Sequence, residues 1–162
     1  MKWFREADLS EFSRISRPDF MGLALNEARK AASRGEVPVG AVVVREGTVL
    51  SLAGNRTREL NDPTAHAEML AIREACQALS AERLTGCDLY VTLEPCTMCA
   101  GAISFARLRR LYFGAPDPKG GAVVNGGRFF RSPTCHSAPD VYEGFREAES
   151  VTLLRAFFEE RR

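Results

Sequence analysis

Hydrophobic residues recur along this chain with two different spacings, and these spacings predict an alternation of helices and strands. Residues 20–31 carry apolar side chains at helical spacing and therefore predict a first helix. Two runs rich in β-branched residues follow at 39–44 and 48–52, with the pair Glu46-Gly47 between them. Such runs joined by a short glycine-containing turn are typical of a β-hairpin, so we expect two antiparallel strands here.

A second helix is predicted from the pair Asp62-Pro63. Aspartate is a favoured helix cap and proline is favoured at the first helical position, so the helix is expected to begin at this pair. Its apolar positions share one face and continue to about residue 79. They are Met69, Ile72, Cys76 and Leu79.

The following stretch predicts a βαβ unit. A short strand is expected at 89–93, a helix from Pro95 to Phe105, and a second strand at 111–113. Two strands joined through a helix in so few residues imply a parallel pair with a right-handed crossover.

The last part of the chain combines an irregular segment with a final helix. Residues 114–139 are rich in glycine and proline and show no sustained period, and we expect a binding loop there because long loops in compact domains are often functional. Val151, Leu154 and Phe158 then fall on one face of a predicted C-terminal helix. The whole pattern predicts an α/β protein with three layers.

Length and composition indicate a single folded domain. The chain has 162 residues, of which 45% are hydrophobic and 27% charged, values that exclude a disordered chain and a small disulfide-stapled protein. Lysine and arginine number 22 against 21 acidic residues, so contact with nucleic acid would need a local basic patch. Residues 1–17 show no clear period and are expected to be a poorly ordered N-terminal extension, with residues 18–162 forming one domain.

The sequence favours a cytoplasmic protein that does not enter a membrane. No run approaches the roughly 18 apolar residues that a span needs, and charged residues occupy the place of a signal peptide's apolar stretch. Five cysteines are an odd number and their spacing does not suggest a disulfide framework. Reduced thiols are therefore expected, which leaves the closely spaced Cys96 and Cys99 free for a metal or for redox chemistry.

Two short motifs together predict a catalytic zinc site. They are His66-Ala67-Glu68 and Pro95-Cys96-Thr97-Met98-Cys99. Imidazole and thiolate are favoured zinc ligands, and Cys96 and Cys99 share a face at the start of a helix. With His66 they make three protein ligands, whereas structural zinc sites have four. The fourth position would stay open for water, as in catalytic sites.

Glu68 completes the predicted chemistry. Zinc lowers the pKa of a coordinated water from about 15.7 towards about 7. A carboxylate beside that water can accept its proton and pass it on. This combination suits the hydrolytic removal of an amino group from a purine or pyrimidine ring, with ammonia as the leaving group.

The paired motifs resemble the H-x-E and P-C-x-x-C signature of the zinc nucleobase deaminases, that is, the cytidine-deaminase-like superfamily. Within it, the chain looks most like the bacterial tRNA-specific adenosine deaminases from about Phe20 to the last helix. The specific stretches are 36–42, 54–56, 62–68, 90–102 and 113–121. The resemblance implies a three-layer α/β/α cytidine-deaminase-like fold with a central mixed sheet.

The same resemblance implies a function and partners. The substrate would be the wobble adenosine of a tRNA anticodon stem-loop, converted to inosine by a homodimer with one Zn²⁺ per chain. Asn55 would bind the flipped nucleobase or its ribose, and Asp117 and Lys119 would lie beside the flanking nucleotides. Aromatic and basic residues of the last helix would lie near the RNA; the candidates are Phe157, Phe158, Arg161 and Arg162. Cys135 and His136 depart from the family's pattern, and their role is left open.

Three other functions remain compatible with these motifs. The nearest is a deaminase of a free base or nucleoside, such as guanine or cytosine, with the same zinc chemistry. A non-catalytic, zinc-stabilised RNA-binding subunit is a second, although it would have no use for Glu68. A dithiol oxidoreductase built on Cys96 and Cys99 is a third, and it would hold no metal.

Overall fold

The computed structural model describes residues 18–162, so the predicted N-terminal extension, residues 1–17, lies outside the described residues. Five strands and four α-helices alternate along the described part, with one short 3₁₀ helix. Their bounds are α2 Phe20–Ser33, β1 Gly40–Arg45, β2 Thr48–Gly54, α3 Ala67–Leu79, β3 Cys87–Leu93, α4 Thr97–Ala106, β4 Arg110–Ala115, η1 Phe129–Arg131, β5 Asp140–Tyr142 and α5 Glu147–Glu159.

The five strands form one mixed sheet in the order β2-β1-β3-β4-β5. β1 pairs antiparallel with both β2 and β3, and β3, β4 and β5 are mutually parallel. The predicted hairpin and the predicted parallel βαβ pair are thereby confirmed. Because β1 runs against both of its neighbours, β2, β3 and β4 point the same way and their carboxyl ends meet at one edge of the sheet.

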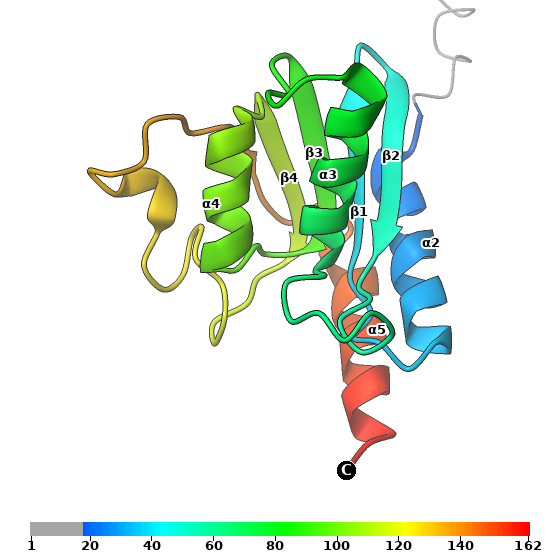
Figure 1. Cartoon of the computed structure of the whole chain (residues 1–162). Helices are drawn as coiled ribbons and strands as arrows, with labels where there is room; N and C mark the ends of the chain where they lie inside the picture. Colours follow the sequence, from blue (N-terminus) through cyan, green and yellow to red (C-terminus); the bar gives the residue numbers. More distant parts are fainter. Residues whose placement is uncertain (1–17) are drawn as a thin grey trace, which may run out of the picture.

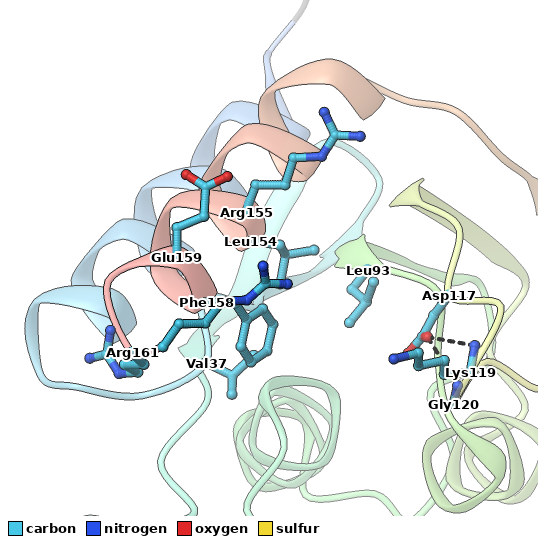
Figure 2. A pocket seen from close by; sticks show the side chains of 11 residues that line it. Val37, Leu93, Asp117, Lys119, Gly120, Leu154, Arg155, Phe158, Glu159 and Arg161 are labelled. Atoms are coloured by element: carbon cyan, nitrogen blue, oxygen red, sulfur yellow. Dashed lines mark hydrogen bonds between the residues drawn. The ribbon is translucent and has the colours of Figure 1, made fainter.

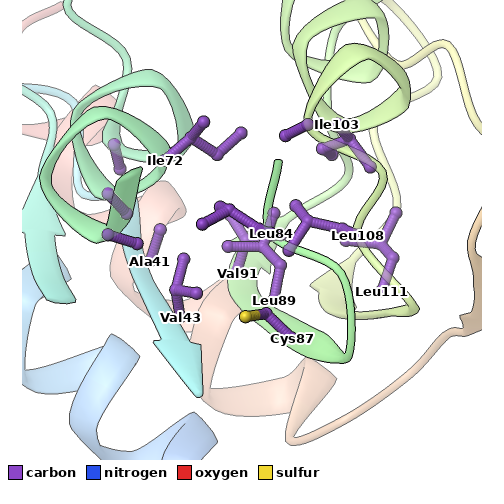
Figure 3. Close-up of a cluster of buried hydrophobic side chains, with 14 of the residues drawn as sticks. Ala41, Val43, Ile72, Leu84, Cys87, Leu89, Val91, Ile103, Leu108 and Leu111 are labelled. Atoms are coloured by element: carbon purple, nitrogen blue, oxygen red, sulfur yellow. The ribbon is translucent and has the colours of Figure 1, made fainter. Parts of the chain in front are cut away.

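Helices cover both faces of this sheet, which confirms the predicted three-layer architecture. Figure 1 shows α3 and α4 side by side in front of the sheet, with α2 and α5 behind it. The larger core lies under α3 and α4, where residues such as Val43, Leu89 and Leu111 meet Ile72 and Ile103 (Figure 3). A smaller apolar cluster lies on the opposite face under α2. Strand residues therefore point alternately into two cores.

The second helix begins later than the sequence pattern predicts. The side chain of Asp62 does not cap it: its Oδ1 accepts hydrogen bonds from the backbone N–H and the hydroxyl of Thr64, at 2.8 and 2.7 Å. An aspartate bonded two residues ahead closes a local turn instead of starting a helix. α3 begins at Ala67, and His66 occupies its N-cap position. This short delay is what places His66 at the end of the helix.

The buried faces of α3 and α5 also differ from the predicted ones. On α3 the buried line consists of Ala67, Glu68, Ala71, Ile72 and Ala75, so Ile72 is confirmed but Met69, Cys76 and Leu79 are only half-buried. The small alanines allow α3 to pack closely on the sheet. The sequence prediction relied on the large apolar residues of this helix, and it therefore missed the alanines on the buried face.

On α5 the predicted apolar face of Val151, Leu154 and Phe158 is not the buried one. Phe158 is 50% exposed, whereas Phe157 is 7% exposed. The buried line of α5 includes Ser150, which lies against Gly114 of β4; a Cβ at Gly114 would come within 2.5 Å of the serine Oγ. The helix is turned so that this small polar residue, about two helical turns before Phe157, faces the sheet. The irregular segment is followed by a short strand, β5, that the apolar pattern did not predict.

None of the helices within residues 18–162 combines the length and the hydropathy that crossing a bilayer requires.

Candidate active site

The predicted site residues follow the carboxyl ends of three neighbouring strands. Asn55 comes directly after β2, Cys96 lies three residues after β3, and Asp117 lies two residues after β4. Because these strands point the same way, the sheet brings the three loops to one edge. The N-termini of α3 and α4 meet at the same edge, because His66 and Cys96 are the N-cap residues of these helices.

His66, Cys96 and Cys99 form a compact group of metal-ligand types. The Nδ1 atom of His66 lies 3.6 Å from the Sγ of Cys96 and 3.5 Å from the Sγ of Cys99. One nitrogen and two sulfurs at normal zinc bond lengths in a tetrahedron would be separated by roughly 3.6 Å, from Zn–N of about 2.05 Å and Zn–S of about 2.3 Å. The two nitrogen–sulfur distances therefore match those of a zinc site, and all three ligand atoms lie within 4.8 Å of one another.

The three ligand candidates also interact with one another as acids. The thiol of Cys99 donates a hydrogen bond that lowers the pKa of Cys96 to about 4, with a further contribution from His66. The same contact with Cys96, together with burial, raises the pKa of Cys99. In the absence of a metal, Cys96 is therefore the thiolate and Cys99 the thiol, whereas a zinc site would use both sulfurs as anionic ligands. A divalent cation would favour the thiolate form of both, since it attracts negative charge.

Glu68 lies at the second position of α3, next to this group. Its side chain is 4% exposed, and burial raises the pKa of the carboxyl to about 7, against a smaller lowering effect of the nearby His66 imidazole. A carboxyl group that exchanges its proton near neutral pH is suited to proton transfer.

A pocket of about 340 Å³ opens over these residues. Its lining includes two of the candidate metal ligands, His66 and Cys96, together with Glu68, Asn55 and Asp117. The backbone N–H of Asn55 donates to the carbonyl of Val39 at 3.0 Å, which holds the residue at the wall. The carboxylate of Asp117 accepts hydrogen bonds from the backbone N–H groups of Lys119 and Gly120, so it also shapes its own loop.

A larger pocket of about 970 Å³ adjoins the first, and Lys119 lines this one instead. The two pockets share wall residues, namely Val37, Leu93, Asp117 and Gly120. Figure 2 shows that the larger pocket lies between the loop that carries Asp117 and the C-terminal end of α5. Four basic side chains line it, namely Lys119, Arg155, Arg161 and Arg162. The exposed ring of Phe158 also faces it.

Two buried carboxylates beside the site were missed from the sequence. Glu36 is 1% exposed and accepts hydrogen bonds from the backbone N–H groups of Arg58 and Glu59. Glu94 is 2% exposed and accepts five hydrogen bonds from the loop after β4. Burial opposes ionisation of Glu94, but these hydrogen bonds together hold its pKa below the usual value. Both residues lie inside the stretches that resemble the family, and this resemblance was the only feature of the sequence that could have pointed to them.

Comparison with known proteins places this fold and site in a family. Residues 15–115 match the family described as the zinc-binding region of cytidine and deoxycytidylate deaminases. This match covers more than half of the chain and both metal-ligand motifs. The chain therefore belongs to the cytidine and deoxycytidylate deaminase family.

Individual relatives define a narrower group within it. The tRNA-specific adenosine deaminase of Agrobacterium fabrum is 68% identical over 90% of this chain and 96% of its own. A structure from a study of A-to-I editing by tRNA:A34 deaminases superposes with a TM-score of 0.83 at 69% identity, over 83% of this chain and 98% of that one. A guanine deaminase from Bacillus subtilis superposes with a TM-score of 0.61 at 32% identity, over 86% and 92%.

Proposed function

We propose that this chain is a zinc-dependent hydrolytic deaminase that converts adenosine to inosine at the wobble position of a tRNA anticodon loop. Residues 18–162 would act as one catalytic domain. The observation that carries the proposal is the grouping of His66, Cys96 and Cys99 beside the buried carboxyl of Glu68, on the floor of a pocket. The similarity to proteins named tRNA-specific adenosine deaminase supports the choice of substrate.

His66, Cys96 and Cys99 would hold one zinc ion per chain. When bound, zinc would supply a Lewis acid that brings the pKa of a water molecule towards about 7. The N-termini of α3 and α4 add partial positive charge at the same point, which stabilises the cysteine thiolates.

Glu68 would move the protons of the reaction. Its carboxylate takes a proton from the attacking water as the oxygen adds to C6 of adenine, and passes it to the ring nitrogen. A second transfer through Glu68 protonates the leaving amine, so that adenosine and water give inosine and ammonia. Asn55 would orient the base at the pocket wall. Burial of Glu68 keeps bulk water from competing for these protons.

The larger pocket supports an RNA substrate over a free base. It adjoins the smaller pocket through shared wall residues, and it combines basic side chains with the exposed ring of Phe158. Arginine and lysine attract phosphates, and aromatic rings stack on unpaired bases. An anticodon loop with its target base in the smaller pocket would place flanking nucleotides here, beside Asp117 and Lys119.

The substrate is tested by mass-spectrometric detection of inosine. An anticodon stem-loop with adenosine at the wobble position is incubated with the protein beside free guanine, cytosine and adenosine. We expect inosine at the wobble position and no turnover of the free compounds. Turnover of a free base with none on the RNA would instead support the alternative, a free-base or nucleoside deaminase with the same zinc chemistry.

Replacing Phe158 should weaken RNA recognition without affecting the fold. We expect Phe158→Ala to raise KM for the stem-loop about tenfold, because a stacked base is worth about 1–3 kcal/mol. Its melting temperature should stay within about 2 °C of the unmodified protein's, since the ring is half-exposed. The neighbouring Phe157→Ala is the comparison: this buried ring should cost about 3 kcal/mol of folding stability instead. Equal KM values for Phe158→Ala and the unmodified protein would contradict an RNA contact.

We further propose that the protein acts as a homodimer, because a small domain that binds an RNA loop gains contact surface from a second subunit. The side chain of Phe105 on α4 is 83% exposed, the highest fraction among the large apolar residues that the structure describes, and we therefore place it in the subunit interface.

Replacing this ring should separate the subunits. We expect Phe105→Ser to sediment as a monomer at micromolar concentration, whereas Leu52→Ser, on the edge strand β2 and 39% exposed, should remain dimeric. Analytical ultracentrifugation of both variants decides the point. A dimer that persists in Phe105→Ser would place the interface elsewhere.

A cytoplasmic location is part of the proposal. The tRNA substrate is found there, and Cys96 and Cys99 must stay reduced in order to bind a metal, as they would in that compartment.

A further inference from the structure

The loop after β4 is tied to a single buried side chain. One carboxylate oxygen of Glu94, Oε1, accepts hydrogen bonds from three successive backbone N–H groups, those of residues 123, 124 and 125, at 3.1, 2.9 and 2.9 Å. The other oxygen, Oε2, accepts from the backbone N–H of Asp117 at 2.8 Å and from the side-chain amide of Asn125 at 2.7 Å. Both ends of the segment 117–125 are therefore fastened to the same group.

The chain makes room for this carboxylate at one glycine. A Cβ at Gly121 would lie within 2.6 Å of Oε2 of Glu94 and 2.5 Å of the carbonyl oxygen of Asp117. A side chain at position 121 would therefore push the segment off the carboxylate. By contrast, a Cβ at Gly127, two residues past the segment, would meet nothing within 4 Å.

The fastened segment forms one wall of the site. Asp117 and Gly120 line both the smaller pocket over the candidate metal ligands and the larger pocket beside α5. Lys119 lies between them and lines the larger pocket. The position of this wall therefore decides how a substrate that occupies both pockets is seated.

Glu94 lines the smaller pocket together with His66 and Cys96, but its side-chain hydrogen bonds do not involve the metal-ligand group. All five of its hydrogen bonds go to the segment 117–125, and none of them goes to His66, Cys96 or Cys99. Its charge is stabilised by convergent N–H groups, an arrangement that can hold an anion tightly away from water.

We propose that Glu94 is a positioning residue that acts on substrate binding: it holds the segment 117–125 in place as the wall that joins the two pockets. This inference rests on the proposed function, because it assigns the wall to an RNA substrate that reaches from one pocket into the other. It predicts an effect on KM that is separate from the proton transfer of Glu68.

Two variants disturb this contact in different ways. Glu94→Gln keeps the shape of the side chain but replaces one accepting oxygen by an NH₂ group, which is a donor. That NH₂ group then faces another donor, either the backbone N–H of Asp117 or the backbone N–H groups of residues 123–125. Gly121→Ala leaves the carboxylate intact and displaces the segment by steric contact. Gly127→Ala is the matched control, with the same added methyl group in open space.

Three measurements are made on each full-length variant: bound zinc, steady-state kinetics on the anticodon stem-loop, and hydrogen–deuterium exchange of the amides of 117 and 123–125. We expect Glu94→Gln and Gly121→Ala to keep their zinc, to raise KM at least about tenfold and to keep kcat within about threefold. Exchange of these amides should become at least about tenfold faster. Gly127→Ala should match the unmodified protein throughout.

Other results would overturn the inference. Faster exchange with an unchanged KM would mean that the wall does not seat the substrate, and unchanged exchange would mean that Glu94 does not hold it. Loss of zinc, or a fall in kcat alone, would assign Glu94 to the metal site. Unfolding of both variants but not of Gly127→Ala would make the contact a requirement of folding. Absence of inosine with the unmodified protein would refute the proposed function, and the exchange data would still decide whether Glu94 holds the segment.

Discussion

Glu68→Gln is expected to lower kcat for inosine formation by about three orders of magnitude while zinc and fold are retained. Glutamine has nearly the same shape as glutamate but cannot accept a proton from water and pass it to the base. The side chain is 4% exposed, so bulk water cannot readily replace it as a proton carrier. Inosine formation is measured under single-turnover conditions, and bound zinc is measured by elemental analysis of the same preparation.

Glu74→Gln is the control for this substitution, because Glu74 lies on the exposed side of the same helix. It should leave kcat unchanged. Full activity of Glu68→Gln would refute the assignment of Glu68 as the proton carrier. Unmodified protein that binds zinc but forms no inosine would instead favour the hypothesis of a subunit that uses its zinc only for stability.

Cys99→Ala is expected to abolish both metal binding and activity. Cys99 is fully buried and its Sγ lies 3.5 Å from the Nδ1 of His66, so its loss removes one of three ligand candidates from the centre of the site. We expect bound zinc to fall from one per chain to well below about 0.1 and inosine formation to fall below about 1%. The melting temperature should fall as well, because the free energy of metal binding no longer stabilises the folded state.

Cys135→Ser is the matched control for a lost thiol. Cys135 is also a free cysteine and is half-buried. Its Sγ lies 3.4 Å from the hydroxyl of Ser104 and belongs to a different group of contacts from His66, Cys96 and Cys99. This variant should keep its zinc and its activity, and loss of zinc would give Cys135 a role that the site does not show. Zinc-free unmodified protein with a disulfide between Cys96 and Cys99 would instead favour the dithiol oxidoreductase.

Most of the fold could be predicted from local sequence because each element has its own spacing of apolar residues. The hairpin, the βαβ unit and both flanking helices followed from such spacings. The errors arose where small or polar residues face the core. Ala67, Ala71 and Ala75 line the buried face of α3, and Ser150 lies on that of α5. Burial of these residues depends on how closely the helix approaches the sheet, and the spacing of apolar residues along the chain does not predict that distance.

The candidate metal ligands could be predicted for a related reason. Cys96 and Cys99 lie one helical turn apart, so local geometry alone brings their sulfurs together. The start of α3 was predicted at Asp62, four residues before His66, but this error did not affect the choice of ligands, because the choice depended on residue type and on the paired motifs. Asn55 and Asp117 were named from resemblance, and their roles stay predictions.

The amino-acid sequence by itself determined which elements form and which side chains are chemically able to hold zinc and move a proton, because these depend on neighbours within a few residues. Only the tertiary structure decided which of two adjacent phenylalanines faces solvent, and that Glu94 holds a wall built from residues 23 to 31 positions further along the chain. Contacts over such distances follow from how the strands and helices pack against one another, and no local pattern encodes that packing.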